Sequence, residues 1–474
     1  MLATVTPEGA FHGMRRLSSL SADGDLFPIP SASASMVLVW LGPGFLTVLM
    51  PSSTDSHTCL QTSCERREAI VESGFRHSSG PALPSVGVLA LVLDSWSEVW
   101  QPRHHIVTRL GRFFECMWLE PPPSWRAVLR GARPGEVATP DPSAIPGFTV
   151  RKAEPWLPKV LRPALVGKIA FDARVRRAHR ALRRKGCERV VAYIWRPEFA
   201  AAIDAAPFDL ACYHIDDEYS FSDDEEPLGP EERRLIARSD RVFIHSPGLL
   251  EKKGGINPNT LFVPNGVDFC AHAQPVPEPA DLAGIPHPRI GYTGRVKRQL
   301  DWSLIERLAR RRPDWHLVLV GAHTRHREVA RAVSRLSPLS NVHFLGPKSH
   351  DVLAEYPQHF DVCIMPYRST DYAQYIFPMK LHEFLASGSP VVGTRIRSLQ
   401  DFERVVRLAE SDESWLEAIE SQLAEVARGG DARRRRRQVA RGYDWDDLTA
   451  TVARSIAIGL GTDVAEALDA KRYG

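Results

Sequence analysis

A helix followed at once by a strand is predicted by residues 375–393, which read Tyr-Ile-Phe-Pro-Met-Lys-Leu-His-Glu-Phe-Leu-Ala-Ser-Gly-Ser-Pro-Val-Val-Gly. Pro378 has a fixed φ that suits a first helical turn, so the pattern predicts a short helix over 380–387. Gly388 can take the left-handed conformation that ends a helix. The apolar residues from 390 onward then predict a buried strand.

Two charged side chains of this helix point to a ligand site. Lys380 and Glu383 are three positions apart and therefore share one helical face. The helix follows a predicted strand over 362–366, and open α/β sheets bind ligands at the carboxyl ends of their strands. An ordinary αβ unit with a surface Lys–Glu pair is the alternative.

The pattern Pro-x-Lys-x-x-Glu-aromatic-Leu-Ala-x-Gly-x-Pro-Val-Val resembles the donor-binding segment of GT-B glycosyltransferases. It looks closest to the glycogen synthase-like superfamily (glycosyl transferases group 1, family 4-like), and within it to enzymes of exopolysaccharide and teichuronic acid assembly. The resemblance implies that Glu383 binds the ribose of a nucleotide-sugar and that basic residues, Lys380 among them, hold its diphosphate. The segment 263–268, Val-Pro-Asn-Gly-Val-Asp, is similar to the one before the family's interdomain hinge.

A second phosphate-binding element is predicted at residues 289–295, which form an apolar strand ending in Thr-Gly-Arg. Gly294 allows close backbone approach to a phosphate, and Arg295 with either Lys297 or Arg298 supplies positive charge. A solvated basic loop is the alternative.

The resemblance also suggests donor contacts at Gly321 and at Pro347, which follow two further predicted strands. One position departs from the family. Many retaining members carry a second glutamate that touches the donor sugar, but Tyr375 stands eight positions before Glu383. We keep Tyr375 as a donor-side candidate, and retention or inversion of configuration stays open.

The first half of the chain begins with an apolar run over 86–94, typical of a buried parallel strand, followed by a Trp-rich loop, a helix over 104–113 and a strand over 114–120. By resemblance, this helix faces the acceptor, which makes Arg103 and His104 acceptor-side candidates. Solvated side chains are the alternative.

An acidic segment predicts the chemistry of the first half. A strand over 210–213 is followed by His214, Asp216, Asp217 and Glu218. Because histidine titrates near neutral pH, we predict a catalytic role for His214 and Asp216, with Asp217 on the acceptor side. Metal binding or a helix-capping loop is the alternative.

Composition bounds the functional classes. The chain of 474 residues has 25% charged and 43% apolar residues, as ordinary globular proteins do, and a net charge of +3 gives no general case for nucleic acid. Seven scattered cysteines without a Cys-x-x-Cys pair predict reduced thiols in a cytoplasmic protein. We predict no metal and no cofactor, because two cations can neutralise a leaving diphosphate.

The predicted organisation has five parts. Residues 1–80 are rich in Ser, Gly, Pro and Thr and are expected to be a poorly ordered extension; their apolar run over 36–50 is too short and broken for a membrane span. The other parts are an acceptor domain (81–270), a proline-rich linker (271–288), a nucleotide-sugar domain (289–440) and a helix crossing back to the first domain (441–474).

We therefore predict an α/β protein with two Rossmann-like domains, each with a mostly parallel doubly wound sheet, facing across a cleft (GT-B). It would transfer sugar from a UDP- or GDP-sugar to a glycan or lipid-linked acceptor in polysaccharide or cell-envelope biosynthesis. A degenerate scaffold and a nucleotide-sugar epimerase are alternatives. The arginine run 433–437 indicates either a solvated helix face or a peripheral contact with the inner face of the plasma membrane.

Overall fold

The computed structural model describes residues 80–98, 100–122, 140–154, 164–220, 227–428 and 430–473. The chain divides into two units, Met1–Arg67 and Glu68–Gly474, and every described residue belongs to the second. The predicted extension, apart from Gly80, lies outside the described residues, as does the apolar run 36–50.

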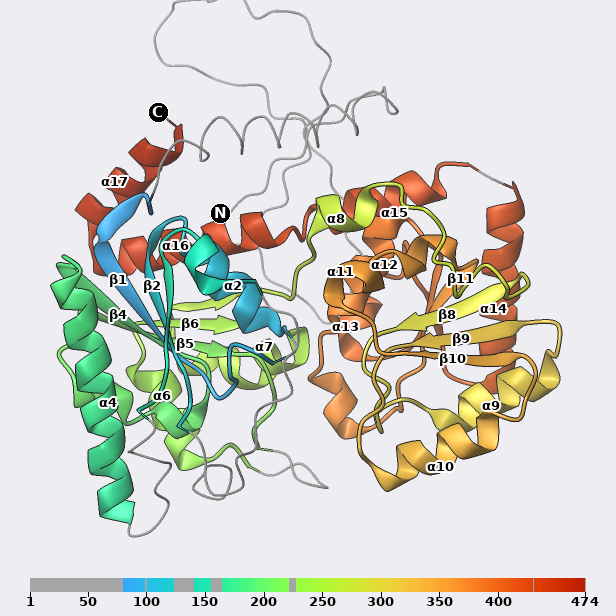
Figure 1. Ribbon diagram of the computed structural model, residues 1–474, viewed down its shortest axis with the longest axis horizontal. Coiled ribbons are helices and arrows are strands. Elements are labelled where there is room, and N and C mark those ends of the chain that lie inside the picture. The colour runs from blue at the N-terminus through green and yellow to red at the C-terminus, as the bar shows by residue number, and fades with distance from the viewer. Residues whose placement is uncertain are drawn as a thin grey trace, which may run out of the picture. The chain divides into compact units, whose positions relative to one another are not determined.

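The first sheet has seven parallel strands in the order β3-β2-β1-β4-β5-β6-β7 (Figure 1). An order that starts in the middle and grows outward on both sides is that of a Rossmann-like sheet. The strands are β1 (Leu83–Leu91), β2 (Phe114–Leu119), β3 (Phe148–Arg151), β4 (Arg189–Ile194), β5 (Leu210–Ile215), β6 (Arg241–Ile244) and β7 (Thr260–Phe262).

Helices cover both faces of this sheet, because alternate residues of a strand point to opposite faces. Val88 of β1 belongs to a core with α2 and α16, whereas its neighbour Leu89 belongs to a core with α4, α6 and α7. The helices of this half are α2 (Pro102–Leu110), α4 (Ala164–Arg184), α5 (Ala202–Ala205), α6 (Pro230–Arg238) and α7 (Pro247–Lys253), with α16 (Trp445–Leu460) and α17 (Thr462–Tyr473) from the end of the chain. Helix α8 (Phe269–Ala273) belongs instead to the core of the second sheet.

The second sheet has six parallel strands in the order β10-β9-β8-β11-β12-β13. Its strands are β8 (Arg289–Thr293), β9 (His316–Val320), β10 (Val342–Gly346), β11 (Val362–Met365), β12 (Val391–Thr394) and β13 (Arg407–Ala409). Its helices are α9 (Trp302–Arg311), α10 (Arg327–Leu336), α11 (His350–Leu353), α12 (Met379–Ser387), α13 (Arg397–Gln400), α14 (Asp412–Arg428) and α15 (Ala432–Arg441). Two parallel α/β sheets confirm the predicted fold class.

The structure differs from the sequence-based prediction in three local features. Two short strands, β3 and β13, were not predicted. Strand β5 continues past Tyr213 to Ile215. Within the predicted linker, Leu282 and Ile285 are buried in the core of the second sheet.

The arginine run is not simply a solvated face. Arg436 is only 5% exposed and hydrogen-bonds the Gly388 carbonyl at 3.3 Å, where α12 ends. Arg433 donates to the carbonyl of Ser387, one residue earlier. Within the described part of the chain, no helix has the length and hydropathy that a bilayer crossing requires.

Candidate nucleotide-sugar site

Three neighbouring strands of the second sheet end in glycines with positive φ. Gly294 follows β8, Gly321 follows β9 and Gly346 ends β10, with φ of 112°, 147° and 71°. The Gly321 amide donates to the Gly346 carbonyl at 2.8 Å, and a Cβ on Gly321 would lie 2.0 Å from the Gly294 carbonyl oxygen. Gly321 is buried against Gly294, whereas Gly294 and Gly346 are partly exposed, so backbone at these two positions is accessible to a ligand. Pro347 follows directly and is exposed.

Helix α12 brings a lysine onto this glycine edge. The Lys380 ammonium lies so close to Gly294 that a Cβ there would come within 2.5 Å of Nζ, and it also sits 5.4 Å above the Tyr292 ring. Glu383 lies one helical turn further along α12 and is half-buried. Gly388, at φ 83°, ends the helix as predicted.

Arg295, Lys297 and Lys380 form a basic cluster. Burial, with Lys380 and Arg295 nearby, lowers the pKa of Lys297 from 10.5 to about 8, which Asp217 partly opposes. In the described chain, none of the three cations lies within ion-pair distance of a carboxylate. Crowded cations without counter-charges form a ready anion site.

Asp217 is the accessible carboxylate of the acidic segment. Its Oδ1 accepts a 2.6 Å hydrogen bond from the Tyr372 hydroxyl. It lines a cavity of about 690 Å³, here named the acidic-loop cavity, together with Arg298, Tyr367 and the residues around Tyr372. This cavity therefore has walls from the loop after β5 and from the loop before α12.

The neighbours of Asp217 are locked in ion pairs. The Asp216 side chain is 5% exposed and is bound by Arg103 and by the Tyr219 hydroxyl. Glu218 is fully enclosed and meets Lys253 at 3.0 Å and Lys252 at 3.2 Å. Asp216 and Glu218 thus hold the loop in shape, and Asp217 is left to face the cavity.

His214 does not follow its strand, as the sequence suggested, but lies within β5. Its ring is 1% exposed, stacks on Trp195 at 4.1 Å and is hydrogen-bonded through Nδ1 to the Tyr193 hydroxyl at 2.7 Å. Burial lowers its pKa well below the usual value, which keeps it neutral. An enclosed imidazole of this kind can position β5 but does not reach the cavity.

Of the two acceptor-side candidates on α2, His104 is buried and Arg103 is partly buried. Arg103 is bound to Asp94 and Asp216 and ties α2 to the acidic loop. His104 is fully buried, its Nδ1 accepts from the Gln101 amide at 3.0 Å, and burial lowers its pKa to about 4. In this arrangement both side chains make contacts that hold the first domain together.

Tyr375 is not placed with the basic cluster. Its ring lies 4.9 Å below the Lys252 ammonium, and a Cβ on Gly248 would meet its Cδ1 at 3.3 Å. Tyr375 therefore packs against α7. The sequence analysis did not single out Tyr292 or Tyr372 as site residues. Of the two, only Tyr372 could have been recognised, because its hydroxyl is a polar group in the loop before α12.

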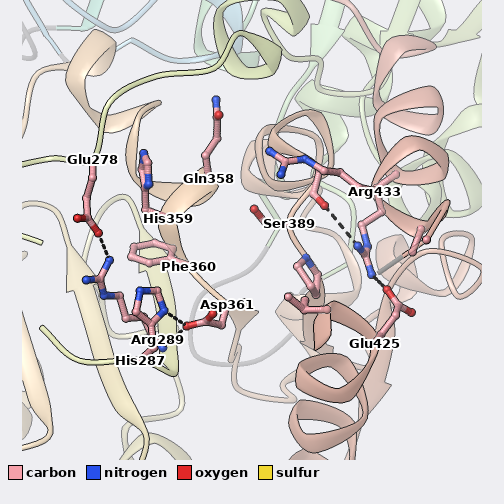
Figure 2. Close-up of a pocket in the computed structure, with 16 residues that line it drawn as sticks. Glu278, His287, Arg289, Gln358, His359, Phe360, Asp361, Ser389, Glu425 and Arg433 are labelled. Atoms are coloured by element: carbon pink, nitrogen blue, oxygen red, sulfur yellow. Dashed lines mark hydrogen bonds and ion pairs between the residues drawn. The ribbon is translucent and has the colours of Figure 1, made fainter. Parts of the chain in front are cut away.

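A cavity of about 410 Å³ lies at the other edge of the second sheet, at the amino ends of β8, β11 and β12 (Figure 2). Figure 2 shows that its charged groups pair with one another: Glu278 with Arg289, and His287 with Asp361 at 2.6 Å. These pairs are structural. Over the described ranges, no three His, Cys, Asp or Glu side chains come together in a way that could hold a metal ion.

Comparisons with known proteins find similar sequences in part of the chain and similar folds over most of it. Residues 287–425 match the family model "Glycosyl transferases group 1". Over 240 residues the chain is 33% identical to "Putative teichuronic acid biosynthesis glycosyltransferase TuaH" of Bacillus subtilis (strain 168), which covers 48% of this chain. The match spans 59% of that relative's length.

Solved structures resemble the chain over most of their length. A UDP-forming alpha,alpha-trehalose-phosphate synthase from Burkholderia vietnamiensis has a TM-score of 0.54 at 13% identity and covers 79% of this chain and 98% of its own. The catalytic domain of starch synthase IV from Arabidopsis thaliana, bound to ADP and acarbose, has a TM-score of 0.54 at 12% identity, with coverages of 79% and 99%. An E. coli structure described as trehalose-6-phosphate bound with UDP-2-fluoro glucose has a TM-score of 0.55 at 11% identity, with coverages of 79% and 99%. The chain therefore has the GT-B fold, carries a glycosyl transferases group 1 domain at residues 287–425 and is homologous to the Bacillus relative.

Proposed function

We propose that this protein transfers a glycosyl group from a nucleotide-sugar, UDP- or GDP-linked, to an acceptor used in cell-envelope polysaccharide synthesis. The observation that carries the proposal is the basic cluster. Arg295, Lys297 and Lys380 have no carboxylate partner among the described residues, and burial together with the two neighbouring cations lowers the pKa of Lys297. A diphosphate supplies the missing negative charge.

The donor's parts are assigned to the groups nearest the glycine edge. The diphosphate lies beside Gly294 and is held by the Lys380 ammonium, which the missing Cβ of Gly294 allows to lie against the backbone there. Glu383 accepts hydrogen bonds from ribose hydroxyls, one turn along the same helix face. Gly321 and Pro347 border the nucleoside, at the ends of the next two strands.

The acceptor enters through the acidic-loop cavity and places a hydroxyl at Asp217. As the acceptor oxygen bonds to the anomeric carbon, its proton passes to the carboxylate of Asp217. The bond between the anomeric carbon and the β-phosphate oxygen breaks, and its electron pair stays on that oxygen. The basic cluster stabilises the growing charge on the nucleoside diphosphate. Asp216 and His214 support this by positioning the loop.

Thermal unfolding in the presence of UDP-, GDP-, ADP- and TDP-sugars tests the donor site. We expect one nucleotide to raise Tm in wild type, since a ligand stabilises the state that it binds. Lys380→Ala and Glu383→Ala should abolish that shift. Lys185→Ala removes a lysine of the first sheet's half, paired with Glu115 at 3.1 Å, and should retain it.

No shift with any nucleotide-sugar, or a shift that survives both α12 substitutions, would overturn the donor site. Donor binding without transfer to any acceptor would instead favour a scaffold. Release of nucleotide without an acceptor would favour an epimerase-like or hydrolytic reaction. We propose that the protein works in the cytoplasm, at the inner face of the membrane where lipid-linked acceptors are found.

A further inference from the structure

A large apolar cavity lies at the carboxyl ends of β1 and β2, on the side of the first sheet covered by α4 and α6. Its volume is about 1050 Å³. Phe171 and Phe199 stack within its wall, with ring centroids 5.9 Å apart. One part of the wall is aliphatic and aromatic, with Leu93, Leu119, Phe171, Phe199, Ile203 and Leu235, and charged side chains line the rest. The apolar part offers contacts to a hydrocarbon chain, and the charged part offers contacts to a polar head.

The apolar cavity connects to the proposed reaction site through shared walls. Glu198 and Glu231 line both the apolar cavity and a second cavity of about 440 Å³. Asp217 and Glu218 line both this second cavity and the acidic-loop cavity. A long ligand can therefore have one end against hydrocarbon and its other end at Asp217.

One cation in the wall is available for a negative charge. Lys168 pairs with Asp172 at 2.8 Å, Arg238 pairs with Asp204 at 2.6 Å, and Arg174 pairs with Glu154 at 3.5 Å. Arg234 also lines the apolar cavity, but within the described residues it meets no carboxylate. It lies one helical turn from Glu231, where the two cavities join.

The mouth of the apolar cavity opens beside an apolar surface. Lys168 and Ala170 line the cavity, while Leu165 and Ile169, on the same first turns of α4, are 68% and 60% exposed. Further along that face of α4 the exposed residues are arginines, with Arg176 among them. Apolar side chains followed by cations suit the surface of an anionic bilayer.

We propose that the apolar cavity binds the hydrocarbon chain of a lipid-linked acceptor, with the acceptor's phosphate at Arg234 and its sugar hydroxyl at Asp217. This inference rests on the proposed glycosyl transfer and names its acceptor class. The chain enters past Leu165 and Ile169 from the membrane.

Farnesyl phosphate, used below its critical micelle concentration, is a suitable probe for calorimetric titration of the full chain. Ala201→Trp puts an indole into the cavity and should weaken binding at least tenfold. Arg234→Gln should weaken binding of farnesyl phosphate but not of farnesol. Val426→Ser, an exposed position on the second domain's α14, serves as the control and should bind as wild type does.

Equal affinity of wild type and Ala201→Trp for farnesyl phosphate would overturn the proposal. If the tryptophan variant fails to fold, undiminished binding of farnesyl phosphate by Arg234→Gln would overturn it instead. Wild type that binds a nucleotide-sugar but not farnesyl phosphate would also overturn it, while leaving the proposed function in place. Failure of both ligands would instead remove the donor site on which the inference rests.

Discussion

The Tyr372 hydroxyl donates a 2.6 Å hydrogen bond to Asp217, and this bond joins the loop before α12 to the loop after β5. Burial and the Asp217 carboxylate raise the pKa of Tyr372, so the hydroxyl stays protonated and remains a donor. The residue proposed to receive the acceptor proton is thus oriented by the same loop that leads into the donor helix.

Tyr372→Phe should impair the acceptor step and spare the donor step. The ring remains, so the fold is kept, but Asp217 loses a hydrogen bond to a charged group, which is typically about 1.5–3 kcal/mol. We expect kcat/KM for the acceptor to fall by about tenfold or more, with an unchanged donor Kd. Tyr356→Phe removes a comparable bond, to Asp281 at 2.7 Å, and is the control. Equal losses in both variants would contradict the assignment.

Donor affinity should fall as pH rises through the pKa of Lys297, which is about 8. The protonated ammonium attracts the diphosphate, so binding is strongest below pH 8 and takes up protons near it. Without ligand the sign reverses: a depressed lysine pKa means that the unfolded chain binds more protons between about pH 8 and 10.5, so stability rises with pH there. Calorimetry in two buffers of different ionisation enthalpy measures the proton uptake. Lys297→Met should abolish it, and persistent uptake would exclude Lys297 as its source.

Local signals predicted the donor side of the fold well. The helix 380–387, the glycine that ends it and the next strand are encoded in consecutive residues, and the structure has α12, Gly388 and β12 there. The edge strand β3 was missed because its Phe-Thr-Val-Arg is short and lies among prolines, so pairing with β2 decides its conformation.

Some site residues could not be placed correctly from the sequence, because contacts with residues distant in the chain decide where their side chains lie. Spacing placed Tyr375 with the donor, but its ring is turned toward Lys252 of the other domain. Likewise, which of three adjacent acids is accessible depends on Arg103 and Lys253, both distant in sequence. Only the folded structure shows that, among the described residues, Asp217 is the acid of this loop without a lysine or arginine partner.

Arg436→Ala should destabilise the domain that carries the donor helix. Its guanidinium is buried, hydrogen-bonds the Gly388 carbonyl and the Gln422 amide oxygen, and pairs with Glu425. Loss of such charge-assisted bonds should cost about 2–3 kcal/mol of unfolding free energy, measured by urea denaturation. Arg435→Ala, at the exposed neighbouring position, should stay within about 0.5 kcal/mol of wild type. Equal effects would mean that the arginine run acts only through its total charge.

Gly321→Ala should lower the unfolding free energy by more than the positive φ of this residue alone explains, and it should disturb the glycine edge. A Cβ added to Gly186, at φ 98°, would have nothing within 4 Å, whereas a Cβ on Gly321 would lie 2.0 Å from a backbone oxygen of Gly294. Gly186→Ala should therefore show only the conformational cost, about 1–2 kcal/mol. Gly321→Ala adds a clash that only a shift of β8 against β9 relieves, and that shift would move Gly294 away from Lys380. We expect a larger loss of unfolding free energy and a donor Kd at least tenfold weaker, with donor affinity unchanged in Gly186→Ala. Equal donor affinity in both variants would show that close packing of the two glycines is not needed for binding.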